Sequence, residues 1–313
     1  MYLLNNFLCC IYFNFIFFYY KNMELLSPNK WIDYELIDTG GFEKLERFGQ
    51  YILIRPEPQA VWDKSLSDSD WGKKANVKFI PQSSNSGVWK KLKAMPAQWN
   101  INYKIGEKTL TFRLGLTSFK HIGIFPEQAV NWDFIYQSLK NFKATPAKVL
   151  NLFAYTGAAS LVASAAGANV THVDSVKQVV NWAKDNAESS KTENIKFIVD
   201  DAVKFVKREL RRGNKYNGII LDPPAYGHGP DGENWKLERD INNLLKDLLL
   251  LLDDKEHFLI LNTYSLGFSS LIVENLAKSI FISNKNITTG EIYLPDNYNK
   301  KLPLGVFVKI IKK

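Results

Sequence analysis

The residues with the clearest chemical potential lie in a segment that begins at Gly218 and reads GIILDPPAYGHGPDG. Its apolar start, Gly218–Leu221, has the composition of a buried strand and delivers Asp222 to the carboxyl end of that strand. Pro223 and Pro224 cannot extend a strand or a helix, so they predict a rigid turn that carries Tyr226 close to the carboxylate. A carboxylate beside an aromatic face suits a flat nucleobase. We therefore predict an acceptor-positioning site made of Asp222, Pro223, Pro224 and Tyr226.

The loop that follows, residues 227–235, is rich in Gly and Pro. Such a loop lacks the apolar periodicity of a strand or helix. A loop of this composition could close over a bound substrate. A purely structural Asp-Pro-Pro turn is the alternative interpretation of this region.

A second signal lies in the segment VLNLFAYTGAAS, where the apolar strand Val149–Phe153 leads into a turn at Gly157 and then a helix of small residues. In open α/β sheets, ligands bind beyond the carboxyl ends of the strands, at turns of this kind. The segment has one Gly and therefore lacks the G-x-G-x-x-G fingerprint, which argues against NAD. A single Gly permits close approach of a smaller ligand, although a tight turn that simply requires Gly is the alternative.

Acidic residues follow the next two predicted strands. Asp174 ends the strand Asn169–Asp174, where an acid can accept both hydroxyls of a ribose or, alternatively, cap the next helix. Asp200 and Asp201 follow the strand Ile195–Val199. We expect Asp201 to accept from an adenine amino group and the other acid to cap a helix. A Gly turn followed by these acids predicts a nucleoside-binding site.

The elements that must position these residues alternate between strands and helices. Strands are predicted at Val149–Phe153, Asn169–Asp174, Ile195–Val199, Gly218–Leu221 and His257–Asn262. Helices are predicted at about 126–142, 157–166, 176–188, 201–212, 234–252 and 268–281. This alternation predicts a parallel sheet with helices on both faces. Glu291–Leu294 and Gly305–Ile311 are expected to form a terminal hairpin.

Residues 23–120 have a different pattern, in which short apolar runs such as Tyr51–Ile54 and Thr109–Leu114 alternate with Gly, Pro, Ser and Asn. This pattern predicts a small β-rich domain. Its central part combines lysines with aromatic residues: Lys73, Lys74, Lys78, Lys90, Lys91, Lys93, Trp71, Phe79, Trp89 and Trp99. These residues could bind RNA phosphates and bases, or they could be a solvated face and a core. The net charge of +8 and the pI of about 9.2 fit a polyanionic partner or simple solubility.

Residues 1–22 are strongly apolar and approach the ~20 residues that span a bilayer. They lack the basic start and the small-residue cleavage site of a secretory signal. Polar sequence begins at Met23, so we expect an upstream start-site artefact, and the alternative is a membrane anchor. Both interpretations leave the globular part in the cytoplasm, and the first predicts no stable membrane association.

Three motifs together resemble the class I S-adenosylmethionine-dependent methyltransferases, in particular the bacterial ribosomal-RNA large-subunit enzymes: Leu152–Gly157 (LFAYTG), Asp222–Tyr226 (DPPAY) and Gly123–Gln128 (GIFPEQ). The resemblance covers about residues 119–313. It implies a Rossmann-like α/β domain at 121–313 with a mostly parallel sheet and a terminal antiparallel hairpin, S-adenosyl-L-methionine as cofactor, and ribosomal RNA as partner. It also implies a cofactor site without metal, formed by Phe153, Ala154, Tyr155, Thr156, Gly157, Asp174, Ser175, Asp201, Ala202, Asp222, Glu127 and Gln128.

Two departures from this family narrow the expected chemistry. Relatives that methylate carbon 5 of cytosine use a Cys after the fifth strand, where this chain has Ser265, and its only cysteines are Cys9 and Cys10. Without a thiolate in the folded body, cytosine C5 is not activated. Amine-methylating relatives place an aromatic residue directly after the prolines, where this chain has Ala225. We expect methylation of a base nitrogen or another non-C5 position. The alternatives are a small-molecule or protein N/O-methyltransferase, and a non-catalytic module that binds S-adenosylmethionine or RNA.

Overall fold

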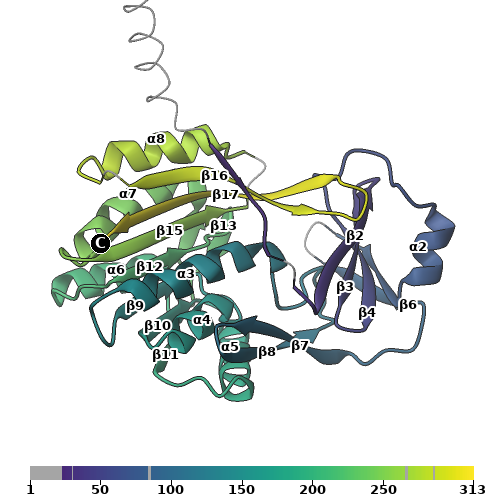
Figure 1. Ribbon diagram of the computed structural model, residues 1–313, viewed down its shortest axis with the longest axis horizontal. Helices are drawn as coiled ribbons and strands as arrows, with labels where there is room; N and C mark the ends of the chain where they lie inside the picture. The colour runs from purple at the N-terminus through teal and green to yellow at the C-terminus, as the bar shows by residue number, and fades with distance from the viewer. Residues whose placement is uncertain (1–22, 30, 84–85, 265–266, 285) are drawn as a thin grey trace, which may run out of the picture.

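An eight-stranded sheet forms the centre of the computed structural model, which describes residues 23–29, 31–83, 86–264, 267–284 and 286–313 (Figure 1). The strand order is β1-β16-β17-β15-β12-β9-β10-β11. The strands are β1 (Glu24–Leu26), β9 (Lys148–Leu152), β10 (Asn169–Asp174), β11 (Ile195–Val199), β12 (Gly218–Leu221), β15 (His257–Thr263), β16 (Ile287–Pro295) and β17 (Lys301–Lys312). Only β17 runs antiparallel to its neighbours. The predicted α/β fold with a terminal antiparallel hairpin is confirmed.

Helices cover both faces of this sheet because its strands are apolar on both sides. One face packs against η1 (Pro126–Gln128), α3 (Ala129–Asn141), α4 (Ala158–Ala165) and α5 (Lys177–Ser189). The other packs against α6 (Ala202–Arg211), α7 (Leu237–Leu251) and α8 (Ser270–Ile280). In β12, Ile220 belongs to the first core, while Ile219 and Leu221 belong to the second. This alternation leaves the carboxyl ends of the strands as the place where polar residues can gather.

The N-terminal part contains a five-stranded sheet in the order β2-β3-β4-β5-β6, and its β-rich character is confirmed. Its strands are β2 (Tyr34–Gly40), β3 (Glu43–Phe48), β4 (Tyr51–Pro56), β5 (Val77–Pro81) and β6 (Gly87–Lys91). One helix was not predicted: α2 (Asp68–Lys74) connects β4 to β5, which are parallel. Ser67 caps this helix by accepting from the Asp70 amide, and Trp71 anchors it in the core.

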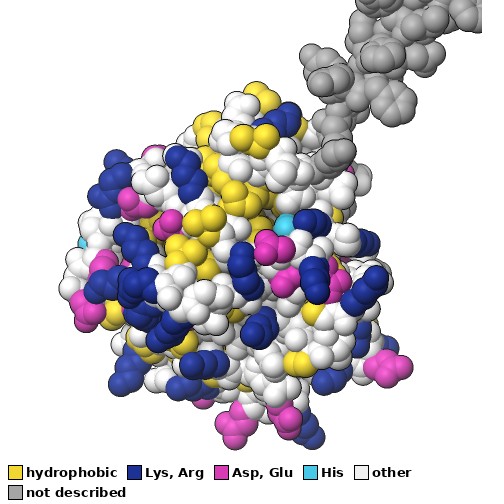
Figure 2. All heavy atoms as spheres, turned by 90° about the vertical axis from the view of Figure 1, so that its left-hand side faces the viewer, with side chains coloured by type: hydrophobic (Ala, Val, Ile, Leu, Met, Phe, Trp, Pro, Cys, Tyr) yellow, Lys and Arg dark blue, Asp and Glu magenta, His cyan; other side chains and the backbone are white. Residues whose placement is uncertain are grey.

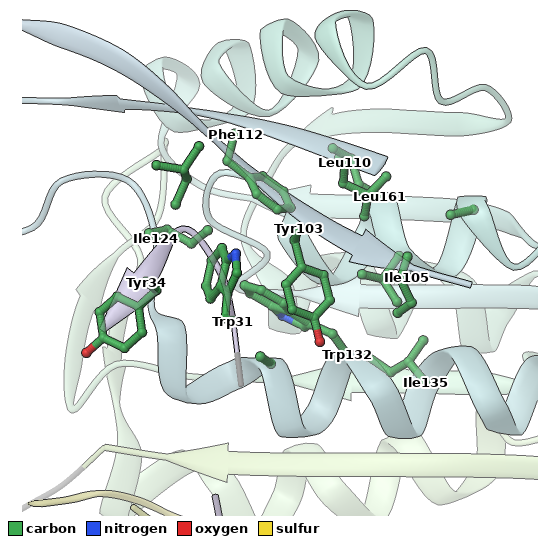
Figure 3. Packing of buried hydrophobic residues seen from close by; sticks show 14 of the residues in the cluster. Trp31, Tyr34, Tyr103, Ile105, Leu110, Phe112, Ile124, Trp132, Ile135 and Leu161 are labelled. Carbon is green, nitrogen blue, oxygen red and sulfur yellow. The ribbon is translucent and has the colours of Figure 1, made fainter. Parts of the chain in front are cut away.

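Two pieces of residues 23–120 pack against the large sheet or the helices that cover it. Strand β1 pairs in parallel with β16. The hairpin β7 (Gln98–Ile105)–β8 (Lys108–Gly115) lies against α4 and α5, where Trp182 Nε1 donates to the Arg113 carbonyl over 2.9 Å. Figure 3 shows the aromatic packing that results, with ring centroids 5.1 Å apart for both Trp31–Tyr103 and Tyr103–Trp132. The core is therefore continuous across the predicted boundary at residue 120.

The terminal hairpin, β16–β17, also connects the large sheet to the small one. Its tip extends beyond the large sheet to the small one (Figure 1). Thr39 Oγ1 donates to Asp296 Oδ2 over 2.8 Å, and Lys300 Nζ lies 2.8 Å from Asp38 Oδ1. Asp38 is fully buried and also accepts from Trp71 Nε1. The hairpin therefore fixes the small sheet relative to the large one.

The basic–aromatic segment is divided between core and surface. Trp71, Phe79 and Trp99 are buried, which fits the alternative that they form a core and not the alternative that they stack on RNA bases. Lys73 and Lys90 are exposed, so a phosphate-binding role stays open for them. Figure 2 shows that Lys and Arg side chains are also numerous on the side of the molecule away from the small sheet. Positive charge is therefore not confined to the N-terminal part.

The apolar extension, residues 1–22, and the question of its role lie outside the described residues. Among the helices that the structure describes, none is long and apolar enough to cross a membrane.

Candidate active site

A cavity of about 60 Å³ opens at the carboxyl edge of the large sheet, between the ends of β9 and β12. It brings together seven of the residues that the sequence predicted for the site: Gln128, Phe153, Ala154, Tyr155, Thr156, Gly157 and Asp222. Asn131, Asn151 and Asn262 add polar atoms that were not predicted. Glu127, Asp174, Ser175, Asp201, Ala202, Pro223, Pro224 and Tyr226 do not line this cavity.

The loop from Phe153 to Gly157 has an unusual backbone. Three of its residues have left-handed conformations, with φ of +54° at Phe153, +50° at Tyr155 and +91° at Gly157. Left-handed conformations at bulky residues are costly and concentrate at functional sites. A Cβ at Gly157 would lie 2.9 Å from the Cβ of Ala183, so this position also requires Gly for space. The loop thus presents backbone rather than side chain to the cavity at its final turn.

Asp174 holds this loop to the second strand. Its Oδ2 accepts from the Tyr155 amide and its Oδ1 from the Val176 amide, each over 2.9 Å. The N-cap of α5 is Val176, so the alternative in which Asp174 caps the next helix is wrong. Burial raises the pKa of Asp174, while the backbone donors oppose that rise. Ser175, the next residue, lies half-buried at the same edge.

Asp200 and Asp201 follow β11, and the expectation of which acid caps the next helix is wrong. Asp201 is the N-cap of α6 and accepts from the Lys204 amide over 2.9 Å, whereas we expected the other acid to cap the helix. Asp200 instead forms an ion pair with Arg208 and accepts from the Asp201 amide. Ala202 begins α6 and is buried. The cap uses only Oδ1 of Asp201, which leaves its adenine-binding role as a prediction.

Asp222 follows β12 at the cavity and forms a hydrogen bond with a buried amide. Asn262 Nδ2 donates to Asp222 Oδ1 over 2.8 Å. Burial raises the pKa of Asp222 to about 6, and the bond from Asn262 acts in the opposite direction. Asn262 was missed as a site residue. A polar residue that ends the otherwise apolar run FLILN, in the strand next to β12, was the available signal.

The region after the two prolines, predicted as a loop at residues 227–235, contains a short hairpin, and its closure over a substrate stays a prediction. The hairpin consists of β13 (Tyr226–His228) and β14 (Asn234–Lys236). Trp235 Nε1 donates to the Pro224 carbonyl over 2.7 Å, and its ring lies 4.9 Å from that of Phe153. The hairpin is therefore fastened to the loop after β9. Tyr226 is 66% exposed on this hairpin, so it is accessible but does not line the cavity.

The segment 123–128 packs against the same loop. Thr156 Oγ1 donates to the Gly123 carbonyl over 2.6 Å, and the rings of Phe125 and Tyr155 are 5.3 Å apart. Glu127 is buried, and burial raises its pKa to about 7, while the charge of Lys44 opposes that rise. The segment thus places a buried acid next to Gln128 at the cavity.

The small sheet reaches this edge through a network of charged side chains. Lys44 Nζ lies 3.1 Å from Glu57 Oε2, and the Tyr264 hydroxyl donates to Glu57 Oε1 over 2.7 Å. Tyr264 directly follows β15, so the contact joins the small sheet to the carboxyl end of the large one. Ser265, which the family resemblance matches to the Cys of cytosine-methylating relatives, lies outside the described residues. Within the described ranges, no group of three or more His, Cys, Asp or Glu residues could hold a metal ion.

Comparison with known proteins agrees with this geometry. A family model described as S-adenosylmethionine-dependent methyltransferase matches residues 84–284. The ribosomal RNA large subunit methyltransferase K/L of Shewanella frigidimarina is 34% identical over 255 residues, which cover 74% of this chain and 34% of that protein. The same-named protein of Shewanella baltica is 27% identical over 289 residues, or 88% of this chain and 37% of that protein. This chain thus spans about a third of the length of these curated relatives.

Solved structures give the same result. The crystal structure of the SAM-dependent methyltransferase from Agrobacterium tumefaciens matches with a TM-score of 0.86 and 34% identity, over 93% of this chain and 94% of that chain. A methyltransferase complexed with SAH shares the fold, with a TM-score of 0.69 and 19% identity over 90% of this chain and 76% of that one. The cavity, the loop 153–157 and these matches lead to one conclusion: the chain is an enzyme of the S-adenosylmethionine-dependent methyltransferase family, with S-adenosyl-L-methionine as its cofactor.

Proposed function

We propose that this methyltransferase modifies a base nitrogen, or another non-C5-cytosine position, of ribosomal RNA. The observation that carries the proposal is that Asp222 and the loop 153–157 line one cavity. A carboxylate that can hold an acceptor therefore lies next to the loop that resembles a cofactor-binding motif. The names of the curated relatives support ribosomal RNA as the acceptor. Such an acceptor would place the protein in the cytoplasm.

The cofactor contacts follow the order of the strands. The loop 153–157, with Glu127 and Gln128 beside it, would hold the methionine part. Asp174 and Ser175 would hold the ribose, and Asp201 with Ala202 the adenine. Asp174 and Asp201 keep acceptor capacity for this role because a carboxylate has about four lone-pair sites. When bound, S-adenosylmethionine supplies a methyl group on a positively charged sulfur, which needs no further activation.

The work left to the chain is chiefly alignment of the acceptor. With a pKa of about 6, Asp222 is largely ionised at neutral pH and can accept from the polar edge of a base. A ring nitrogen that carries no proton needs no general base. Tyr226 is exposed on the hairpin that follows and offers a stacking face. Pro223 and Pro224 keep Asp222 and this hairpin in a fixed relation.

Electrostatics favour a polyanionic acceptor. The chain has a net charge of +8, and Lys and Arg side chains are numerous on the face in Figure 2. A positive surface attracts RNA phosphates and speeds association. This attraction is not specific for sequence, so recognition of one nucleotide would depend on the cavity.

Nucleoside mass spectrometry of ribosomal RNA from a strain that lacks the gene tests this function. We expect one methylated nucleoside to be absent. Wild-type protein should restore it, and the Asp222→Ala variant at equal abundance should not. An unchanged nucleoside profile would contradict the RNA proposal and favour a small-molecule or protein acceptor.

A further inference from the structure

Asp222 and Asn262 occupy neighbouring positions on two parallel strands. Leu221 of β12 pairs with Leu261 of β15, so the next residues along each strand lie side by side at the carboxyl edge. Both side chains line the cavity. Asn262 is only 2% exposed, and its Nδ2 donates to Asp222 Oδ1 over 2.8 Å. A buried amide is costly unless it is hydrogen-bonded, so its presence here calls for a specific reason.

The strand on the other side of β15 leaves room for this amide. β17 carries Gly305, where a Cβ would lie 2.9 Å from Asn262 Oδ1 and 3.4 Å from its Nδ2. Real Cβ atoms are not found that close to other atoms, so a side chain at position 305 would displace the amide. The pairing of β16 with β17 is also irregular here, because the register shifts next to Ile292, the partner of Gly305. Three adjacent strands thus contribute Asp222, Asn262 and Gly305 to one arrangement.

We propose that Asn262 is the positioning residue of this methyltransferase, which holds the Asp222 carboxylate in one orientation toward the cavity, and that Gly305 provides the space this amide needs. The inference rests on the proposed function in one respect, which is that Asp222 positions the methyl acceptor. The arrangement itself follows from the distances among the three residues.

The bond should also set the protonation of Asp222. An N–H that donates to a carboxylate favours its ionised form. The titratable groups around the pair are Glu127 from η1, with Lys44 of β3 beyond it, and Tyr155 from the loop after β9. The charge of Asp222 raises the pKa of Glu127, so the two acids are electrostatically coupled, and this coupling can be separated from the effect of Asn262 by mutation.

The test is a carboxyl carbon-13 NMR titration of the full chain labelled at aspartate, with the Asp222 signal assigned by its absence in Asp222→Asn. In the wild type we expect a midpoint near pH 6. In Asn262→Leu the midpoint should rise by about one pH unit, because a hydrogen bond to a charged group is lost. The same rise should occur in a Glu127→Gln background. A merely structural residue would lower the melting temperature without moving this midpoint.

Thr263→Val is the matched control. Thr263 is the next residue of β15, is equally buried, and its hydroxyl has no hydrogen-bond partner among the described residues. Its replacement should leave the Asp222 midpoint unchanged. Gly305→Ala approaches the amide from the opposite strand and should raise the midpoint with Asn262 still present.

A folded Asn262→Leu variant with the wild-type midpoint would overturn the proposal. If that variant does not fold, the Asp222 midpoint is measured in Asn262→Ser and Gly305→Ala instead, and a wild-type midpoint in both would overturn the proposal. Single-turnover methylation of ribosomal RNA from the deletion strain should fall about threefold in Asn262→Leu at pH 6.5, because a smaller fraction of Asp222 is ionised, with the Kd for S-adenosylmethionine unchanged. The titration needs no acceptor, so an inactive wild type on this RNA would contradict the proposed function alone.

Discussion

At the scale of single residues, Asp174 shows how one carboxylate can serve both the fold and the cofactor. Its two oxygens accept from the Tyr155 and Val176 amides, and the proposed ribose contact uses the remaining lone pairs. Asp174→Ala should therefore weaken S-adenosylmethionine binding by about 1–3 kcal/mol, since the ribose hydroxyls of the bound cofactor lose their acceptor. Calorimetry measures this loss. Glu107→Ala, at an exposed turn, is the control, and unaltered affinity in Asp174→Ala would remove Asp174 from the site.

The ionised form of Asp222, which the proposed function requires, should lower the free energy of unfolding. Its pKa of about 6 lies above the usual value of a carboxyl, so the folded state binds its proton more tightly than the unfolded state does. The free energy of unfolding therefore decreases as the pH rises from about 4 to 6. Asp222→Asn removes this term and should be more stable than the wild type at pH 7.5 by about 1–2 kcal/mol, while methyl transfer is abolished.

Urea unfolding of both proteins at pH 7.5 and pH 4 checks this prediction. The stability difference should shrink toward pH 4, where the wild-type carboxyl is protonated in the folded state. Cofactor affinity should change little. Methyl transfer by Asp222→Asn at the wild-type rate would remove Asp222 from the acceptor site.

At the scale of elements, the hairpin β13–β14 owes its position to one side chain. Trp235 is buried, donates to the Pro224 carbonyl and packs on Phe153. Trp235→Ala should lower the free energy of unfolding by about 3–5 kcal/mol and loosen the hairpin that carries Tyr226. Hydrogen exchange of residues 226–236 should increase more than that of β12. Equal protection in the variant would mean that other contacts hold the hairpin.

Tyr226 itself can be tested on the intact hairpin. The ring is exposed, so its removal should not destabilise the fold. Tyr226→Ala should weaken RNA binding by about 1–3 kcal/mol, and Tyr226→Phe should retain most of it, because stacking needs the ring and not the hydroxyl. Binding to ribosomal RNA and melting temperature measured on the same samples separate the two effects. Undiminished binding by Tyr226→Ala would exclude the stacking role.

The sequence predicted the elements whose signals are local. Each strand of the methyltransferase sheet from β9 to β17 is an apolar run between turns, and the structure has all of them. Strand β1 escaped prediction because it has three residues and its partner Gly290 lies far along the chain. Helix α2 was missed although Ser67 is a good cap, since seven residues contain only one buried anchor, Trp71.

The site was predicted where side chains follow strand ends and missed where a contact crosses strands. The loop 153–157 and Asp222 were found because each follows a buried strand. The amide of Asn262 depends on which strand neighbours β12, which the sequence of β15 alone does not reveal. Similarly, Asp200 and Asp201 are adjacent acids, and only the entry angle of α6 decides which of them caps the helix.

At the scale of the whole molecule, the contact between the small sheet and the terminal hairpin should dominate the acid sensitivity of the fold. Asp38 is fully buried and pairs with Lys300, and hydrogen bonds from Lys300 and nearby donors lower its pKa despite burial. The stability it contributes is present above about pH 4 and is lost as the pH falls through its depressed pKa. Asp38→Asn should cost about 1–3 kcal/mol at pH 7, because the charged hydrogen bond to Lys300 is lost, while Lys300, whose side chain is 22% exposed, keeps Asp296 at 3.5 Å.

Denaturant unfolding at several pH values measures the difference in free energy of unfolding between the wild type and Asp38→Asn. This difference should become smaller toward acid pH. Asp68→Asn is the control, since the ion pair of this exposed residue with Lys64 should contribute little to stability. A constant difference between Asp38→Asn and the wild type from pH 7 to pH 3 would contradict the assigned role of the ion pair.

The terminal hairpin also has a consequence for biosynthesis. During translation the small sheet emerges from the ribosome early, with Asp38 inside it, while Asp296 and Lys300 are made some 260 residues later. Strand β1 likewise waits for β16, and β15 waits for β17. Pairings so distant in sequence slow folding and leave open strand edges exposed in the meantime. The small sheet and strand β1 therefore stay without these partners until β16 and β17 have left the exit tunnel.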